Sequence, residues 1–395
     1  MSEHIFPGNE RYSGDLRDGK RHGHGTCIYP DGSRYEGQWR DDLPHGRGIL
    51  IISEQEQYSG NWVAGKKEGT GRYTYPSGTV YDGEWRAGRK HGHGTLTFAD
   101  GGRYEGEFRN DLREGEGTYT YPDGQQYVGS WKRDRKHGPG KLHYSEEEFY
   151  DGNWLNGRRH GRGLYKTVAG SSYCGQWHDD MMEGEGTYKS ADGEQYKGQW
   201  HKNLRHGRGE YIFASGNTYS GQWKKGVMHG NGTLRLTDGT VYAGHWQNGC
   251  MHGQGVLRFA DGTVYEGEFR DDGKEGQGIC IYPDGSRYSG QWKDNERNGI
   301  GVCTYPDGGR YQGDWQGDKR HGRGKHVDED GTCYEGEWQE DNKHGPGRMR
   351  FPNGQVREGL WQDDKYLKNG SSDRPDPRKF SVPDSGIDDL LEFSK

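Results

Sequence analysis

The sequence predicts an all-β chain: an elongated, single-layer antiparallel sheet in which each 23-residue repeat contributes one β-hairpin. Three observations lead to this prediction. They are a fixed period, an alternation of large and small side chains within each repeat, and turn-forming residues at the same places in every repeat. In such repeat architectures each repeat buries its face only against its neighbours.

A tyrosine opens each repeat and recurs every 23 residues without an insertion. The 15 full repeats begin at Tyr12, Tyr35, Tyr58, Tyr81, Tyr104, Tyr127, Tyr150, Tyr173, Tyr196, Tyr219, Tyr242, Tyr265, Tyr288, Tyr311 and Tyr334. A sixteenth start has Arg357 in the tyrosine position and carries only one strand's worth of the pattern. We therefore expect a lead over residues 1–11, a repeat array over residues 12–366, and a disordered acidic tail with a short helix over residues 367–395.

The first strand of each repeat reads Tyr-x-Gly-x-Trp, and a period of two places these three residues on one face of the sheet. All 13 Trp lie four residues after an opening position, which we call the tryptophan position. We expect both positions to form an inward-facing aromatic core, represented by Tyr35, Trp39, Tyr81, Trp85, Tyr219, Trp223, Tyr242, Trp246, Tyr311 and Trp315.

The second strand begins with Gly-x-Gly, so Gly230, Gly232, Leu234 and Leu236 are predicted to share one face. The glycines leave room for the aromatic rings of the first strand.

Two turns complete the predicted hairpin. Seven residues after each opening tyrosine, at the turn position, the chain always has Gly, Asp or Asn, which tolerate positive φ or form Asx turns. Asp-Gly pairs such as Asp238-Gly239 close the other end of the repeat. At ~4.8 Å per strand, each repeat advances the sheet ~9.6 Å, and the right-handed strand twist should coil it.

The composition argues against several classes of protein. Only 27% of residues are hydrophobic and the mean hydropathy is -1.30, but 27 Tyr and 13 Trp at regular positions can still build a core. The longest apolar run, at 49–52, is too short to span a membrane, and the N-terminus lacks the pattern of a signal peptide. Six Cys without such a signal indicate reduced thiols in an intracellular protein, and the net charge of -7 disfavours nucleic-acid binding.

No catalytic, metal or cofactor site is predicted. Ten of the 18 His lie ten residues after an opening tyrosine, the histidine position, and neighbouring ones should be ~9.6 Å apart, too far to share a zinc ion. Weak chelation by His22 with His24, or by His91 with His93, stays open as an alternative. Cys27, Cys280 and Cys303 are expected in the core, whereas the other cysteines leave intermolecular pairing or metal binding at a dimer contact open.

Nine residues after each opening tyrosine, at the basic position, 11 of the 15 repeats have Lys or Arg. These residues are Arg21, Lys67, Lys90, Arg113, Lys136, Arg159, Arg205, Lys274, Arg297, Arg320 and Lys343. We expect them to line one edge of the sheet. They are either solvated turn residues or a linear site for anionic lipid headgroups or acidic protein segments.

The motifs Tyr-x-Gly-x-Trp, His-Gly-x-Gly and Asp-Gly in 23-residue steps resemble the MORN repeat, the membrane occupation and recognition nexus. The resemblance covers about residues 12–364. It implies stacked hairpins in a twisted, grooved sheet used for protein contacts, self-association and, in some members, lipid binding. The chain is similar to long all-repeat members that scaffold cytoskeletal and flagellar structures.

These features predict a non-enzymatic scaffold that forms a homodimer through a terminal repeat edge. Its expected partners are cytoskeletal or axonemal proteins in the cytoplasm, a cilium or flagellum, or the cell cortex. The alternative is a peripheral membrane protein that binds anionic phospholipids through the basic positions. In the tail, Ser381 is a candidate phosphosite, and Ile387, Leu390 and Leu391 have helical spacing for a partner groove.

Overall fold

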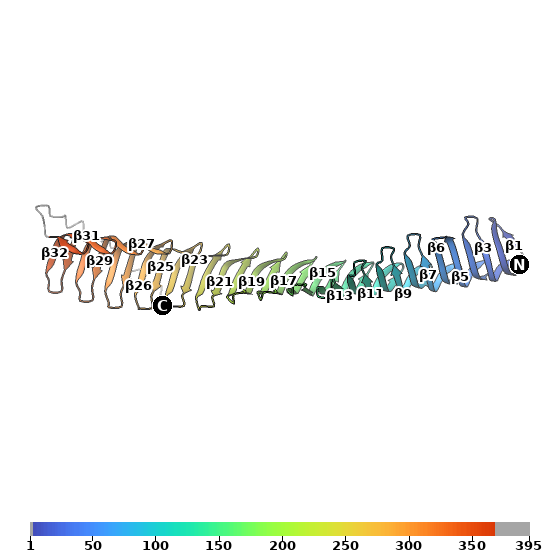
Figure 1. The fold of residues 1–395 in the computed structure, drawn as a ribbon, viewed down its shortest axis with the longest axis horizontal. Helices are drawn as coiled ribbons and strands as arrows, with labels where there is room; N and C mark the ends of the chain where they lie inside the picture. The colour runs from blue at the N-terminus through green and yellow to red at the C-terminus, as the bar shows by residue number, and fades with distance from the viewer. Residues whose placement is uncertain (1–2, 368–395) are drawn as a thin grey trace. The chain divides into compact units, whose positions relative to one another are not determined.

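The computed structural model describes residues 3–367, and within that range it contains strands and turns but no helix. The all-β prediction is therefore confirmed. The chain divides into an N-terminal body that ends at Leu204 and a C-terminal body that begins at Arg205. In each body, successive antiparallel hairpins lie side by side (Figure 1).

The strands of the N-terminal body are β1 (Glu3–Phe6), β2 (Glu10–Arg17), β3 (Lys20–Ile28), β4 (Arg34–Arg40), β5 (Leu43–Ser53), β6 (Glu56–Val63), β7 (Lys66–Thr74), β8 (Val80–Arg86), β9 (Arg89–Thr97), β10 (Arg103–Arg109), β11 (Leu112–Thr120), β12 (Gln126–Lys132), β13 (Arg135–His143), β14 (Phe149–Leu155), β15 (Arg158–Lys166), β16 (Ser172–His178), β17 (Met181–Lys189) and β18 (Gln195–His201).

The strands assigned to the C-terminal body are β19 (Leu204–Ile212), β20 (Thr218–Lys224), β21 (Val227–Arg235), β22 (Val241–Gln247), β23 (Cys250–Arg258), β24 (Val264–Arg270), β25 (Gly273–Ile281), β26 (Arg287–Lys293), β27 (Glu296–Thr304), β28 (Arg310–Gln316), β29 (Lys319–Val327), β30 (Cys333–Gln339), β31 (Asn342–Arg350), β32 (Val356–Gln362) and β33 (Lys365–Leu367).

The register explains why each repeat needs its glycines. Within the first hairpin, Tyr12 faces Cys27 and Gly14 faces Gly25. A Cβ built on Gly25 would lie 2.2 Å from the Tyr12 hydroxyl oxygen. The tyrosine ring therefore occupies the space that a side chain at Gly25 would need.

The turn position has the predicted backbone. Asp41 and Asp42, between β4 and β5, have φ values of 50° and 67°, and Arg40 faces Leu43 directly across them. Two successive residues with positive φ form the type I′ turn that suits a twisted hairpin. At the other end of a repeat, the Asp31 carboxylate accepts a hydrogen bond of 2.9 Å from the Ser33 backbone N–H. The residues predicted to form the two turns of the hairpin therefore do so.

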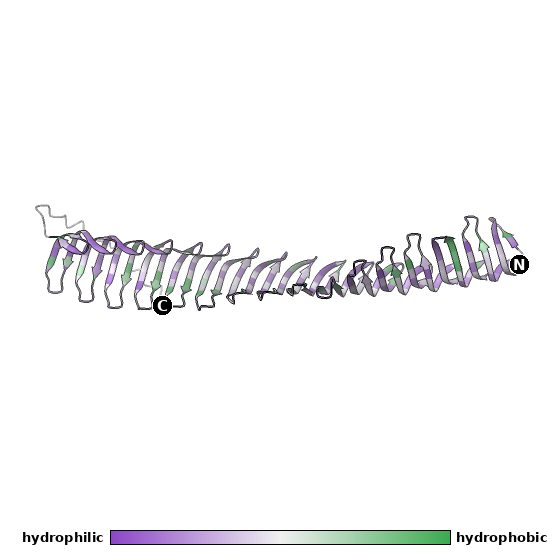
Figure 2. Cartoon of the chain, in the orientation of Figure 1, coloured by the Kyte–Doolittle hydropathy of each residue, from purple (hydrophilic) through white to green (hydrophobic). Residues whose placement is uncertain are grey.

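The core is a row of edge-to-face aromatic rings along one side of each body. Tyr35 contacts Trp39 of its own repeat and Trp62 of the next, with ring centroids 4.9 and 5.4 Å apart. The expected core residues, Tyr35, Trp39, Tyr81, Trp85, Tyr219, Trp223, Tyr242, Trp246, Tyr311 and Trp315, are all buried. Figure 2 shows strands that are mostly hydrophilic or intermediate on the Kyte–Doolittle scale, with short hydrophobic stretches.

The two ends of the array hold elements that the 23-residue pattern did not indicate. Strand β1 lies within the expected lead and pairs with β2 through His4 and Tyr12. Strand β33 pairs with β32, so the sixteenth start also forms a short hairpin. Ser381, Ile387, Leu390 and Leu391 lie outside the described residues.

Candidate binding surfaces

A row of glycines crosses the strands of the N-terminal body, and its backbone lines the face opposite the aromatic core. Each of these glycines faces another directly across the strands, in the order Gly14, Gly25, Gly37, Gly48, Gly60, Gly71, Gly83, Gly94, Gly106, Gly117 and Gly129. A Cβ on these glycines would point toward the tyrosine rings, so on the opposite face the row presents only backbone and forms the floor of a groove that runs from β2 to β12.

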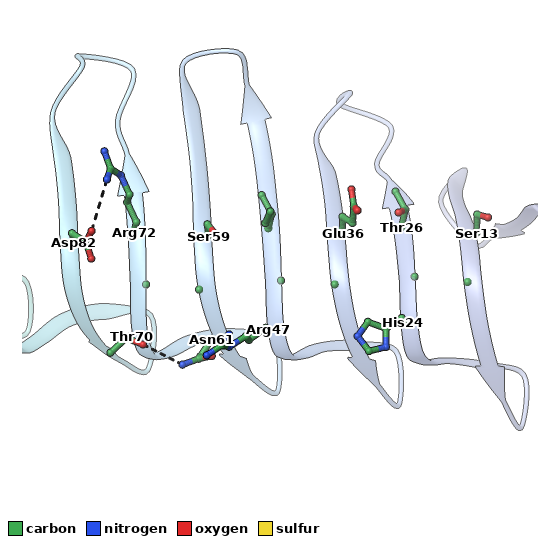
Figure 3. A pocket seen from close by; sticks show the side chains of 17 residues that line it. Ser13, His24, Thr26, Glu36, Arg47, Ser59, Asn61, Thr70, Arg72 and Asp82 are labelled. Atoms are coloured by element: carbon green, nitrogen blue, oxygen red, sulfur yellow. Dashed lines mark hydrogen bonds and ion pairs between the residues drawn. The ribbon is translucent and has the colours of Figure 1, made fainter.

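The first section of the groove has a volume of 730 Å³, and two rows of polar side chains flank its floor (Figure 3). One row is Ser13, Thr26, Glu36, Ser59, Arg72 and Asp82, and the other is His24, Arg47, Asn61 and Thr70. Arg72 lies 3.9 Å from Asp82, and the Asn61 amide donates a 3.4 Å hydrogen bond to the Thr70 hydroxyl. Both charges and hydrogen-bonding groups therefore face the groove, while Ile49 adds an apolar contact.

The second section has a volume of 560 Å³ and is more acidic. Asp82, Glu105 and Glu116 line it, and His93 is its one basic lining residue. Arg103 lies 2.7 Å from Glu105 and offsets part of that charge. The groove can therefore accept polar and positively charged groups along consecutive repeats.

The groove lining was not among the predicted site residues. The two rows of polar side chains that flank the groove lie on the polar face of the strands, so the two-residue alternation predicts only that they face solvent. The alternation does not show that a row of glycine backbone separates the two rows. The signal that would have located it is the regular pairing of the two glycine positions across every strand.

The basic positions differ from the exposed edge that the sequence led us to expect. The Arg113 guanidinium lies 4.4 Å from the ring centroid of Trp131, and its Nε lies 3.1 Å from the Asp134 carboxylate. Arg159, Arg297 and Arg320 repeat this arrangement with Asp180, Asp318 and Asp341, and their side chains are 21% exposed. A long apolar stem and a planar cation favour stacking over the core rings.

The lysines at this position also lie over rings. The Lys67 Nζ lies 3.9 Å from the ring centroid of Tyr73 and 4.6 Å from that of Trp85. Burial lowers the pKa of Lys67 and of Lys136 to about 8. These two amines are therefore less fully charged near neutral pH than ordinary lysines.

Exposed cations lie on either side of the turn instead. Arg86 faces Arg89 across its turn, and Lys132 faces Arg135 in the same way. All four side chains are exposed. They flank the turn on both strands, a pairing that only the hairpin register reveals.

The structure also places the histidines and cysteines that the sequence singled out. Within residues 3–367, no group of three His, Cys, Asp or Glu side chains is placed to hold a metal ion. Cys27, Cys280 and Cys303 are buried free thiols, and burial raises the pKa of Cys280. At several histidine positions, including His22 and His91, the ring Nδ1 is buried without a hydrogen-bond partner. The same range contains no helix long and apolar enough to span a bilayer.

Comparison with known proteins identifies one family. The model of the MORN repeat matches residues 12–34, 35–53, 58–80, 81–103, 104–126, 127–146, 150–172, 173–195, 196–218, 219–241, 242–264, 265–287, 288–310, 311–333 and 334–356. None of the curated proteins matches the chain significantly.

Solved structures with detectable likeness include two domains of CPAP proteins. The TCP domain of SAS-4 from Drosophila melanogaster, in complex with a proline-rich motif of Ana2, is 15% identical, with a TM-score of 0.26 over 39% of this chain and 85% of that one. The TCP10 domain of Danio rerio CPAP is 13% identical, with a TM-score of 0.20 over 68% of this chain and 99% of that one. Likeness at these scores carries no argument about function.

Proposed function

Because the chain belongs to the MORN repeat family, we propose that it is a non-enzymatic scaffold that holds protein partners along its sheet. The glycine-floored groove of the N-terminal body is the observation that carries this proposal. It offers a bare backbone floor with polar and charged walls over consecutive repeats, which suits an extended segment of another protein. The acidic second section favours basic residues in that segment.

The assemblies we propose for it are cytoskeletal, ciliary or flagellar, or cortical, with axonemal proteins among the partners. The test is detergent extraction of the source cells, with the tagged chain imaged in the insoluble residue and its neighbours identified by proximity labelling. Retention on discrete insoluble structures is the expected result. Complete release into the detergent fraction would count against this proposal.

The groove itself is tested by reversing its charge. Glu105→Lys with Glu116→Lys should reduce both retention and the labelling of basic partners, because the lining would repel them. Glu185→Lys is the matched control, since Glu185 holds the same position as Glu116 in a repeat outside the groove. Equal loss in the control would mean that the groove has no specific role.

We also propose that the chain self-associates through a terminal edge. Among the described residues, β1 pairs with β2 and β33 pairs with β32, so each end presents a short edge strand. Deletion of residues 334–366 should convert a dimer into a monomer. An unchanged molar mass by light scattering would reject this interface.

A peripheral membrane function is the alternative, and the exposed pairs around the turns favour it more than the stacked basic positions do. Lys132→Glu with Arg135→Glu should abolish co-sedimentation with phosphatidylserine vesicles and the salt sensitivity of that binding. Binding that is unaffected by this reversal, or absent in the unmodified chain, would exclude the turn edge as a lipid site.

A further inference from the structure

The aromatic face of the C-terminal body has an apolar strip where two consecutive basic positions are methionines. Met228 faces Trp223 and Met251 faces Trp246 across their hairpins, the place that Lys136 takes opposite Trp131. The strip consists of Met228, Leu234, Leu236, Met251, Leu257 and Phe259, each partly exposed.

The exposure of the leucine fifteen residues after the opening tyrosine differs between repeats with a lysine and repeats with a methionine at the basic position. Leu96 and Leu142 are 8% and 5% exposed, and their repeats have Lys90 and Lys136 at the basic position. Leu234 and Leu257 hold the same place in their own repeats but are not buried. We infer that the lysine stems cover the leucine in those two repeats, whereas the methionines leave it open to a further apolar contact.

The strip is bounded by two cations that lack a carboxylate partner. Arg205 stacks 4.5 Å from the Trp223 ring and Lys274 stacks 4.5 Å from the Trp292 ring. In the described part of the chain neither forms an ion pair, because the turn positions that follow them are Gly226 and Asn295. Arg297 and Arg320 of the same body each have an aspartate there. Asp272, whose carboxylate accepts a hydrogen bond of 2.7 Å from the Met251 backbone N–H, lies between these two cations. The surface therefore complements a segment that is apolar in its centre and acidic at its ends.

One segment of this chain has that chemistry. Residues 387–393, outside the described range, read Ile-Asp-Asp-Leu-Leu-Glu-Phe, with four apolar and three acidic side chains. The stretch from residue 368 to 386 can extend up to ~60 Å at ~3.3 Å per residue. Ten strand steps separate β33 from β23, a path of ~48 Å at ~4.8 Å per strand, so the segment can reach the strip.

We propose that residues 387–393 dock on the Met228–Met251 strip of the same chain, with their apolar side chains on Leu234 and Leu257 and their carboxylates near Arg205 and Lys274. The contact would cover an apolar surface that Lys90 and Lys136 cover in the repeats of Leu96 and Leu142. It would also leave the groove of the N-terminal body free, so it is separate from the proposed scaffold function.

Hydrogen–deuterium exchange of the full-length chain, read by mass spectrometry, tests this docking. The backbone amides of residues 387–393 should exchange at least tenfold more slowly than in an unstructured peptide. Met228→Lys with Met251→Lys should abolish that protection, and lysine is a residue that this position accepts in other repeats. Met182→Lys, at the same position in the N-terminal body, is the matched control and should leave the protection unchanged.

A change on the other side of the contact separates docking from local structure in the tail. Leu390→Asp with Leu391→Asp should release residues 387–393 and also speed exchange of the β21 and β23 amides nearest the strip. Unprotected amides in the unmodified chain, or protection that survives the methionine substitutions, would overturn the proposal. Protection that disappears on dilution would also overturn it, and would assign the strip to the tail of a second copy.

Discussion

The indole Nε1 of Trp246 donates a hydrogen bond of 3.2 Å to the backbone oxygen of Gly232 in the preceding repeat. The same bond recurs between Trp39 and Gly25 at 3.0 Å and between Trp85 and Gly71 at 2.9 Å. Each of these tryptophans therefore links its repeat to the preceding repeat by a hydrogen bond, while its ring packs between two tyrosines. Repeats bound in this way gain stability from their neighbours more than from their own contacts.

Trp246→Ala should lower the free energy of unfolding by roughly 3 to 5 kcal/mol, because it empties a fully buried ring site and removes the hydrogen bond to the Gly232 carbonyl. Trp246→Phe is the control, since Phe269 holds the same position in the next repeat, and it should cost about 1 kcal/mol. Urea unfolding followed by circular dichroism measures both. Equal midpoints for the alanine variant and the unmodified chain would contradict the inward placement of this ring.

The fold could be predicted largely from sequence because its determinants are local and periodic. The face on which Tyr219, Gly221 and Trp223 lie follows from their spacing of two residues. The turn requires only that the Asp or Gly at the turn position adopts a positive φ. The features that could not be predicted, the stacking of the basic positions and the groove, depend on contacts with the neighbouring repeat. Arg113 was expected at an exposed edge, but it stacks on Trp131 and pairs with Asp134, whose position is fixed by the register. The groove was missed for the same reason.

Asp134 shows how a turn residue also joins repeats. Its carboxylate accepts a hydrogen bond of 3.0 Å from the Arg113 backbone N–H, and its own N–H donates one of 3.1 Å to the Arg113 carbonyl. Asp134→Ala should destabilise the chain by about 1 to 3 kcal/mol, because it removes the acceptor and places a residue poorly suited to a φ of 66°. Asp134→Asn keeps the acceptor, as Asn203 does for Met182, and should cost little in a thermal melt. A large loss in the asparagine variant would mean that charge, rather than this hydrogen bond, dominates.

A substitution at Gly232 tests whether the Tyr219 ring requires a glycine at that position. A Cβ at this residue would lie 2.3 Å from the Tyr219 hydroxyl oxygen and 2.5 Å from the ring carbon that bears it. Gly232→Ala should therefore destabilise the C-terminal body by about 1 to 3 kcal/mol or more, as overpacking does in other cores. Gly239→Asn is the control, since a Cβ at Gly239 meets no atom within 4 Å and asparagine tolerates positive φ. Chemical denaturation of both variants compares them. Similar losses would show that backbone conformation, not the ring, sets the requirement for glycine.

The aromatic core should make stability fall in alkaline solution. Burial raises the pKa of Tyr12 and of Tyr242 to about 12, from an ordinary value of 10.0. Between those pH values the folded chain holds a proton that the unfolded chain releases, so the free energy of unfolding decreases as pH rises above about 10. Ultraviolet absorbance of tyrosinate should increase together with the loss of circular dichroism. Tyrosine ionisation that is complete before the sheet unfolds would contradict the burial of this core.

Lys67 and Lys136 should make the free energy of unfolding increase with pH, in a pH range below that of the tyrosines. Burial lowers the pKa of each to about 8 from 10.5, so between these values the unfolded chain holds protons that the folded chain has lost. Their contribution to stability therefore rises as pH increases from about 8 to about 10. Lys67→Met with Lys136→Met should remove this rise while preserving the fold, because methionine holds the same position in Met228 and Met251. Urea midpoints measured at several pH values test the sign. A midpoint that rises equally in the variant and the unmodified chain would show that other groups cause it, and that these two amines stay charged over the rings.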